Sequence, residues 1–145
     1  MINTVSLKQA GLMALLLLTV GFAATPVAHA ADKQGVVIQI SDNDPAKWNL
    51  ALNNAKNIQN DLGKNNVQIE IVAYGPGINM LKKDSDVGPR LDEVTMEGIT
   101  VSACQNTMHA LKLSEKDMHK SIGYVPSGAV EIIKKQKAGW AYVRP

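Results

Sequence analysis

The sequence contains a single cysteine, Cys104, so no disulfide can form within the chain. Aromatic residues make up only 4% of its 145 residues, which argues against an aromatic surface for stacking nucleobases. Charge of one sign is scarce as well, because 15 Lys and Arg stand against 13 Asp and Glu and the two kinds are interspersed. A nucleic-acid partner is therefore not expected. The 46% hydrophobic content is typical of a folded protein, and the length favours one domain.

The apolar stretch near the N-terminus, residues 10–24, is shorter than the roughly 20 residues that a membrane-spanning helix needs. Lys8 precedes this stretch, Pro26 follows it, and alanines occupy both ends of the segment 28–30. A positive charge, an apolar run, a helix breaker and a small-residue cleavage site, in that order, predict a secretory signal peptide. We expect residues 1–30 to be removed after Ala30, which leaves no stable membrane anchor.

The remaining residues, 31–145, are expected to form one domain in the periplasm. Strand-like and helix-like segments alternate throughout it, and no internal repeat interrupts them. The expected strands are short apolar, β-branched runs at 36–40, 67–73, 99–103, 122–125 and 140–143. The expected helices cover 45–62, 87–97, a short stretch from 106 and 127–137. This alternation predicts an α/β domain with a largely parallel sheet and helices on both faces.

Cys104 follows the expected strand 99–103 and precedes a helix expected to begin at Asn106. Functional residues gather at this end of parallel strands. Unpaired N–H groups and the positive end of a helix dipole stabilise a thiolate, the nucleophilic form of cysteine. Elsewhere in the chain, and with no predicted link to Cys104, Ser127 and Gly128 are expected to offer N–H groups at the start of the last helix. The alternative is that Cys104 is a small apolar side chain, buried and inert.

His109 is the candidate partner of Cys104 for a Cys-His catalytic pair, against the alternative of a solvent-facing helical histidine. His119 lies in a polar stretch and is expected on the surface. The spacing of these three residues fits no usual metal site, and no cofactor is expected. Gly75-Pro76-Gly77 lacks the spacing of a dinucleotide-binding or phosphate-binding loop and is interpreted as a structural turn.

Two segments carry a family resemblance: VSACQNTM, which includes Cys104, and the C-terminal YVPSGAVEIIKKQKAGWAYVRP. With the strands at 36–40 and 67–75, they make the chain similar to the exported branch of the DsrE/DsrF-like family of sulfur-relay proteins. The resemblance implies a single-domain, mainly parallel five-stranded sheet flanked by helices, with flavodoxin-like layering. It also implies a homo-oligomer and a cysteine that carries sulfur as a persulfide, a role that falls on Cys104.

The leading hypothesis is a periplasmic sulfur carrier in which Cys104 exchanges sulfur with a donor or acceptor protein or a small sulfur compound. One alternative is a non-catalytic binding or assembly module with a pocket near residues 74–79 and Cys104. Another is a cysteine hydrolase, which needs His109 within hydrogen-bond reach of the sulfur. Low accessibility of Cys104 would favour the binding module over both others.

Overall fold

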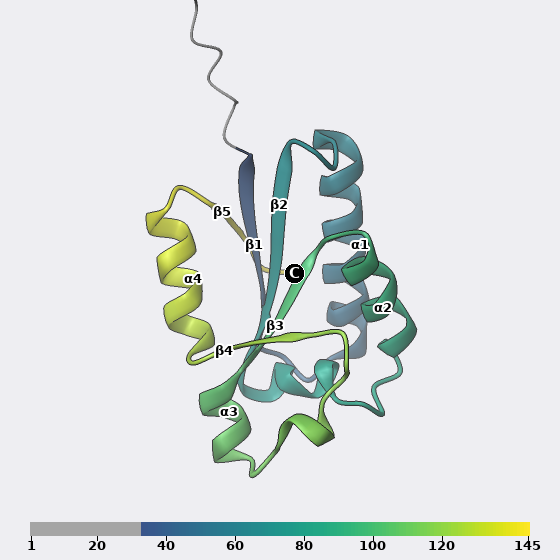
Figure 1. Cartoon of the computed structure of the whole chain (residues 1–145), viewed down its shortest axis with the longest axis vertical. Helices are drawn as coiled ribbons and strands as arrows, with labels where there is room; N and C mark the ends of the chain where they lie inside the picture. The colour runs from purple at the N-terminus through teal and green to yellow at the C-terminus, as the bar shows by residue number, and fades with distance from the viewer. Residues whose placement is uncertain (1–32) are drawn as a thin grey trace, which may run out of the picture.

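Five parallel strands form the centre of the molecule, in the spatial order β4-β3-β2-β1-β5 (Figure 1). The computed structural model describes residues 33–145, and the expected signal peptide lies outside them. The strands are β1 (Gln34–Ile40), β2 (Val67–Ala73), β3 (Thr100–Cys104), β4 (Gly123–Val125) and β5 (Ala141–Val143). The single-domain parallel α/β fold that the alternation predicts is confirmed.

Helices cover both faces of this sheet (Figure 1). The longer ones are α1 (Pro45–Leu62), α2 (Gly88–Met96) and α4 (Gly128–Lys137). The shorter ones are the 3₁₀ helix η1 (Gly75–Leu81), α3 (Gln105–Ala110) and the 3₁₀ turn η2 (Glu115–Asp117). α1 and α2 lie on one face and α4 lies on the other, while α3 lies at the carboxyl end of the strands.

The local signals that begin and end α1 act as the sequence predicts. The Asp44 side chain accepts a hydrogen bond from the Ala46 N–H at 2.9 Å, and Pro45 occupies the first helical position. Gly63 follows the helix with a φ of +86°, in the region that favours glycine.

The two faces of the sheet bury very different amounts of apolar surface. The face under α1, α2 and η1 packs the main core, in which Ile38, Leu52 and Ile71 are fully buried. The face under α4 has a small cluster of three buried residues, Val37, Val72 and Ile132. Because β1 is covered on both sides, residues 36–38 form a continuous apolar run, and residues 71–73 do the same at the end of β2. The first part of β2 alternates instead, with Gln68 and Glu70 between apolar residues.

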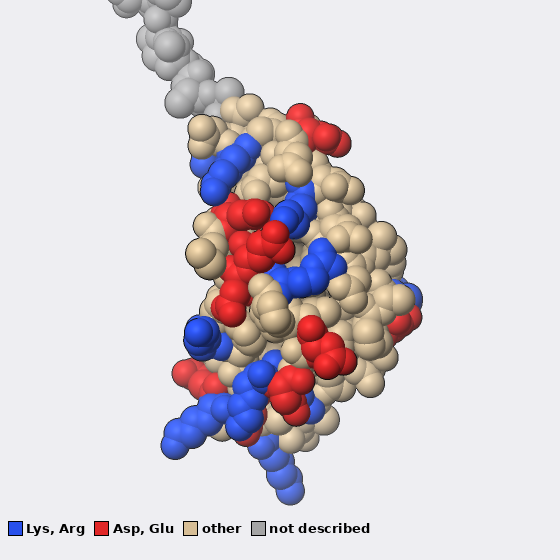
Figure 2. Space-filling view, turned by 90° about the vertical axis from the view of Figure 1, so that its right-hand side faces the viewer, with Lys and Arg blue, Asp and Glu red and all other residues tan. Residues whose placement is uncertain are grey.

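Charged side chains of both signs are spread over the side of the molecule that α1 and α2 cover, and several basic ones gather at the lower end of the molecule in this view (Figure 2). Lys56 of α1 forms an ion pair with Glu93 of α2, and its ammonium lies 3.6 Å from the Glu97 carboxylate. Between residues 33 and 145, none of the helices combines the length and the apolar character that crossing a membrane requires.

Candidate functional site

Cys104 occupies the junction between a strand and a helix. It is the last residue of β3 and the N-cap of α3, so its side chain lies at the carboxyl edge of the sheet, as the sequence predicts. The residue is only 4% exposed. Cys104 is the single cysteine of the sequence, and in the described residues its thiol is free and buried.

Two helix starts converge on the Cys104 sulfur. The backbone N–H groups of Asn106 and Thr107, in the first turn of α3, and of Gly128, the first residue of α4, lie around it and lower the pKa of its thiol. The Asn106 N–H donates to the Pro126 carbonyl at 3.1 Å. That bond ties the segment before α4 to the start of α3 and so holds the two helix starts together.

Gly128 is the residue that allows α4 to begin so close to the sheet. A Cβ at this position would lie 3.0 Å from both Cβ and Cδ1 of Tyr74, tighter than ordinary side-chain contacts. The side chain of any other residue would push the start of α4 away from the carboxyl end of β2. The glycine therefore keeps its N–H group within reach of the sulfur.

The Thr107 hydroxyl is oriented by a second contact. Its oxygen accepts a hydrogen bond from the Gly75 N–H at 2.9 Å. Because a hydroxyl can accept and donate at once, this acceptor role leaves the Thr107 proton available to the nearby Cys104, whose pKa the hydroxyl lowers. Gly75 thereby joins the end of β2 to the cysteine site.

Burial acts on the thiol in the opposite direction to these donors. Burial raises the pKa of Cys104, but the Thr107 hydroxyl, followed by the backbone N–H groups of Gly128, Thr107 and Asn106, outweighs it, and the pKa lies below its ordinary value. The donors stabilise the thiolate directly, as they do at other helix starts that activate cysteines. Cys104 is thus a buried thiol whose pKa is lowered by its surroundings.

A groove of about 460 Å³ opens at the carboxyl edge of the sheet, along the helix that follows Cys104, and Cys104 itself does not line it. It is lined by residues of η1, α3 and the position after α3, namely Gly75, Pro76, Asn79, Asn106, Thr107, Ala110 and Leu111. None of these side chains is charged. Thr107 belongs both to the wall of the groove and to the donors around Cys104, so the two features are adjacent.

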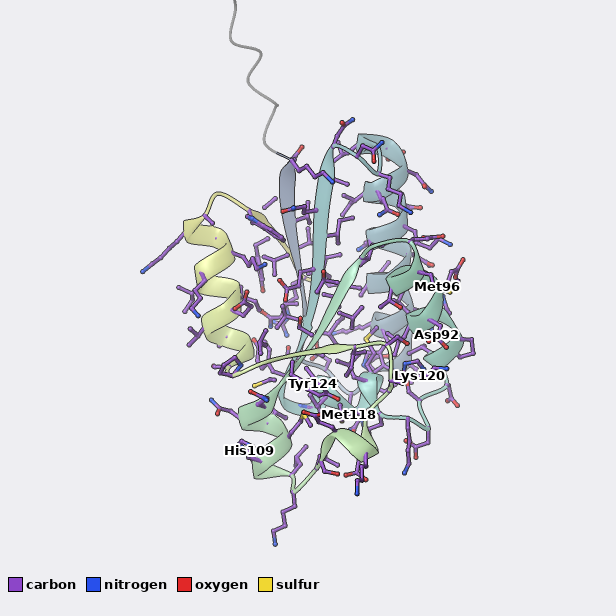
Figure 3. All side chains as sticks on the ribbon, viewed as in Figure 1. Asp92, Met96, His109, Met118, Lys120 and Tyr124 are labelled. Carbon is purple, nitrogen blue, oxygen red and sulfur yellow. The ribbon has the colours of Figure 1, made fainter. Side chains whose placement is uncertain are left out.

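His109 and Cys104 are not brought together. His109 lies exposed on the outer side of α3 (Figure 3), and no hydrogen bond links it to Cys104 among the contacts of the described residues. One and a half helical turns separate the ring from the sulfur, which the sequence spacing already indicates.

His119, which is expected on the surface, is largely covered instead, with 11% of its side chain exposed. Its Nδ1 lies 2.9 Å from the Ser121 hydroxyl, and that hydroxyl donates to Asp92 of α2. The prediction is wrong because long-range packing against α2 covers a stretch that is locally polar. Across the described part of the chain, the acidic, histidine and cysteine side chains form no group of three that could hold a metal ion.

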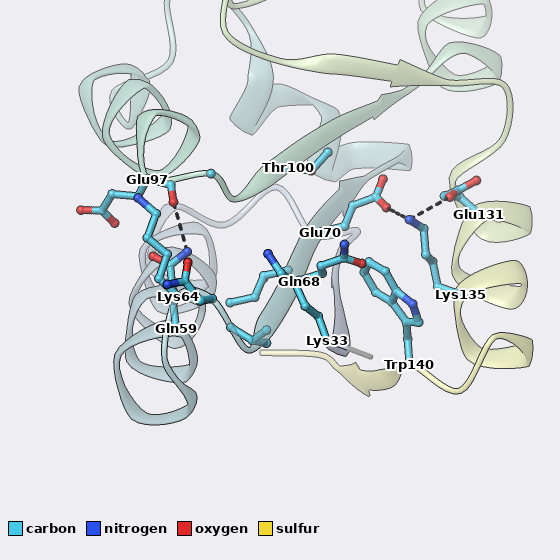
Figure 4. Close-up of a pocket in the computed structure, with 14 residues that line it drawn as sticks. Lys33, Gln59, Lys64, Gln68, Glu70, Glu97, Thr100, Glu131, Lys135 and Trp140 are labelled. Atoms are coloured by element: carbon cyan, nitrogen blue, oxygen red, sulfur yellow. Dashed lines mark hydrogen bonds and ion pairs between the residues drawn. The ribbon is translucent and has the colours of Figure 1, made fainter. Parts of the chain in front are cut away.

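A second cavity, of about 570 Å³, lies at the opposite, amino-terminal edge of the sheet (Figure 4). Inside it the nearly buried Glu70 of β2 accepts a hydrogen bond from the Ser102 hydroxyl and pairs with Lys135 of α4, both at 2.7 Å. The Lys135 ammonium also lies 4.1 Å from the centre of the Trp140 ring. These contacts anchor α4 on the sheet and thereby help to fix the position of Gly128. The signal for this ion pair in the sequence is Glu70, a charged residue within the otherwise largely apolar strand 67–73.

The fold and the cysteine site define a parallel α/β protein with a buried cysteine at a strand-to-helix junction. The chain matches the DsrE/DsrF-like family over residues 32–145, and it belongs to that family. No curated protein matches the sequence.

Solved structures share the fold. The protein of unknown function MTH1491 from Methanobacterium thermoautotrophicum is similar with 35% identity and a TM-score of 0.74, over 78% of this chain and 100% of that one. The ychN protein from E. coli has 10% identity and a TM-score of 0.63, over 79% of this chain and 99% of its own. The protein of unknown function BT1422 from Bacteroides thetaiotaomicron has 18% identity and a TM-score of 0.64, over 77% and 95%. The last two similarities concern the fold alone.

Proposed function

We propose that this protein is a sulfur carrier in which the Cys104 thiolate takes up and passes on sulfane sulfur as a persulfide. The observation that carries the proposal is the set of donors around the sulfur, which lowers the pKa of the thiol although burial alone would raise it. The DsrE/DsrF-like family is generally linked to sulfur relay, which supports the same reading.

The donors suit both halves of such a transfer. In loading, the Cys104 thiolate attacks a sulfane sulfur, and the S–S bond of the donor breaks so that its electron pair leaves on the donor's thiolate. In unloading, a nucleophilic acceptor attacks the outer sulfur, and the electron pair returns to Cys104. A thiolate with a lowered pKa is the better leaving group in this second step. The N–H groups of Asn106, Thr107 and Gly128 stabilise it as it forms.

The proposal extends to an exported, homo-oligomeric protein that receives sulfur in the periplasm from a donor protein or a small sulfur compound. Export is supported by the signal-peptide pattern of residues 1–30. Self-association is supported by Val130 and Ile133, neighbours on one face of α4 that are 46% and 51% exposed.

Incubation with inorganic polysulfide, followed by removal of the reagent and intact-mass measurement, tests the carrier. The wild-type chain is expected to gain sulfur, and Cys104→Ser is expected to gain none. His109→Ala is expected to load like the wild type, because His109 is exposed and away from the sulfur. A wild-type chain without any adduct, whose folded thiol also resists iodoacetamide, would end the proposal. Loss of loading in His109→Ala would favour a Cys-His pair instead.

A non-catalytic binding module is the second candidate, and the 4% exposure of Cys104 favours it. Its pocket corresponds to the groove formed by residues 75–79 and α3. If this function is the right one, Cys104→Ala retains biological activity, whereas a bulky residue in the groove abolishes it. If the protein is a sulfur carrier instead, Cys104→Ala loses the biological activity.

A further inference from the structure

The groove beside Cys104 has more room than a persulfide uses. A single added sulfur extends the side chain by an S–S bond of about 2 Å. The groove has a volume of about 460 Å³ and reaches along α3 to Ala110 and Leu111. Its wall includes Asn106 and Thr107, the residues of the first turn of α3 that follow Cys104 and lower the pKa of its thiol.

The chemistry of the wall restricts what can occupy this space. No charged side chain lines the groove, so its wall offers an occupant no ion pair. A chain of sulfane sulfur atoms is uncharged along its length, polarizable and thin, and its negative charge lies on the terminal atom. Asn79 and Asn106 line the groove, and side-chain amides carry the kind of N–H group that such an atom accepts from. One N–H of the Asn79 amide already donates to Asn43 at 3.1 Å.

We propose that Cys104 holds a chain of several sulfane sulfur atoms, supplied as inorganic polysulfide, and that the groove between η1 and α3 is the seat of this chain. The inference rests on the proposed carrier function and adds to it the class of substrate and the number of sulfur atoms that Cys104 holds. The 4% exposure of the thiol agrees with a thin linear donor, because a folded protein cannot bring its own persulfide to a sulfur so deeply placed without moving α3 or α4.

The loading step needs no oxidant besides the polysulfide. The Cys104 thiolate attacks an inner sulfur of the polysulfide dianion, and the bond between that sulfur and its neighbour breaks. The attacked sulfur stays on Cys104 with the rest of its chain, which ends in an anionic sulfur. The other fragment leaves with the electron pair of the broken bond and takes a proton from water, which releases hydroxide. One S–S bond forms and one breaks.

Intact-mass spectra after polysulfide loading distinguish a chain from a single atom. The wild type is expected to show a series of adducts separated by the mass of one sulfur atom. Ala110→Phe places a ring in the groove from an exposed position and is expected to lose the adducts with two or more sulfurs while keeping the adduct with one. The control is Ala138→Phe, an exposed alanine after α4 that lines none of the described cavities, and it should keep the full series.

The possible negative results distinguish the proposal of a sulfur chain in the groove from the proposal of a sulfur carrier. A single-sulfur adduct on the wild type and on both variants would overturn the chain and leave the carrier standing. A full series that survives in Ala110→Phe, with thermal melting showing that the variant is folded, would overturn the groove as the seat. No adduct on the wild type would contradict the carrier function itself.

Discussion

Replacement of Thr107 by Val is expected to slow the alkylation of Cys104 at neutral pH by about tenfold. Thr107 supplies the side-chain hydrogen bond that lowers the pKa of the thiol, and valine keeps the shape of the side chain but has no proton to donate. Hydrogen bonds to charged groups are worth about 1.5 kcal/mol or more, which corresponds to a tenfold change in the thiolate population. The rate with iodoacetamide, measured on the folded protein, gives the comparison.

Thr95→Val is the matched control for this substitution. The Thr95 hydroxyl bonds to the Leu91 carbonyl within α2 at 2.8 Å and is not among the donors to Cys104. The control should therefore react at the wild-type rate. Equal rates for wild type, Thr107→Val and Thr95→Val would show that the hydroxyl does not act on the sulfur.

Gly77→Ala is expected to destabilise the fold by about 3 kcal/mol, at the upper end of the usual cost of overpacking. A Cβ on Gly77 would lie 2.4 Å from the Ile40 carbonyl oxygen and 2.7 Å from its carbon, both of which belong to the backbone of β1. Neither atom can rotate away as a side chain can, so the contact forces η1 and the end of β1 apart. Chemical denaturation of both proteins measures the difference in the free energy of unfolding.

Gly123→Ala provides the comparison for this effect. A Cβ there would have ordinary contact with the Val101 carbonyl oxygen at 3.8 Å, and the residue is exposed. Its free energy of unfolding should stay close to that of the wild type. If both alanine variants were equally stable, the close approach of η1 to β1 would be refuted.

The fold was predictable because local signals and the apolar pattern agree along the chain. Asp44 and Pro45 begin α1, Gly63 follows its end, and β-branched residues are frequent in the three longer strands, β1, β2 and β3. The position of Cys104 before a helix follows from the same local reasoning. The N–H groups at Gly128 are also visible as the start of a helix.

That the start of α4 at Gly128 lies close to Cys104 could not be predicted from local sequence. Gly128 reaches Cys104 because β4 lies beside β3 in the sheet and because Pro126 accepts a hydrogen bond from Asn106. Such contacts depend on strand order, which the residue pattern leaves open. The anchoring of α4 by Glu70 and Lys135, and the burial of His119 against α2, arise in the same way from long-range packing.

The pH dependence of Cys104 alkylation tests the activated thiol most directly. Only the thiolate reacts, so the rate rises with pH as the thiol ionises, and burial changes the maximal rate more than the midpoint. Since the donors lower the pKa of Cys104, the midpoint is expected below the value of about 8.5 of a free cysteine. A midpoint at or above that value, or a folded thiol that does not react at any pH, would contradict an activated carrier.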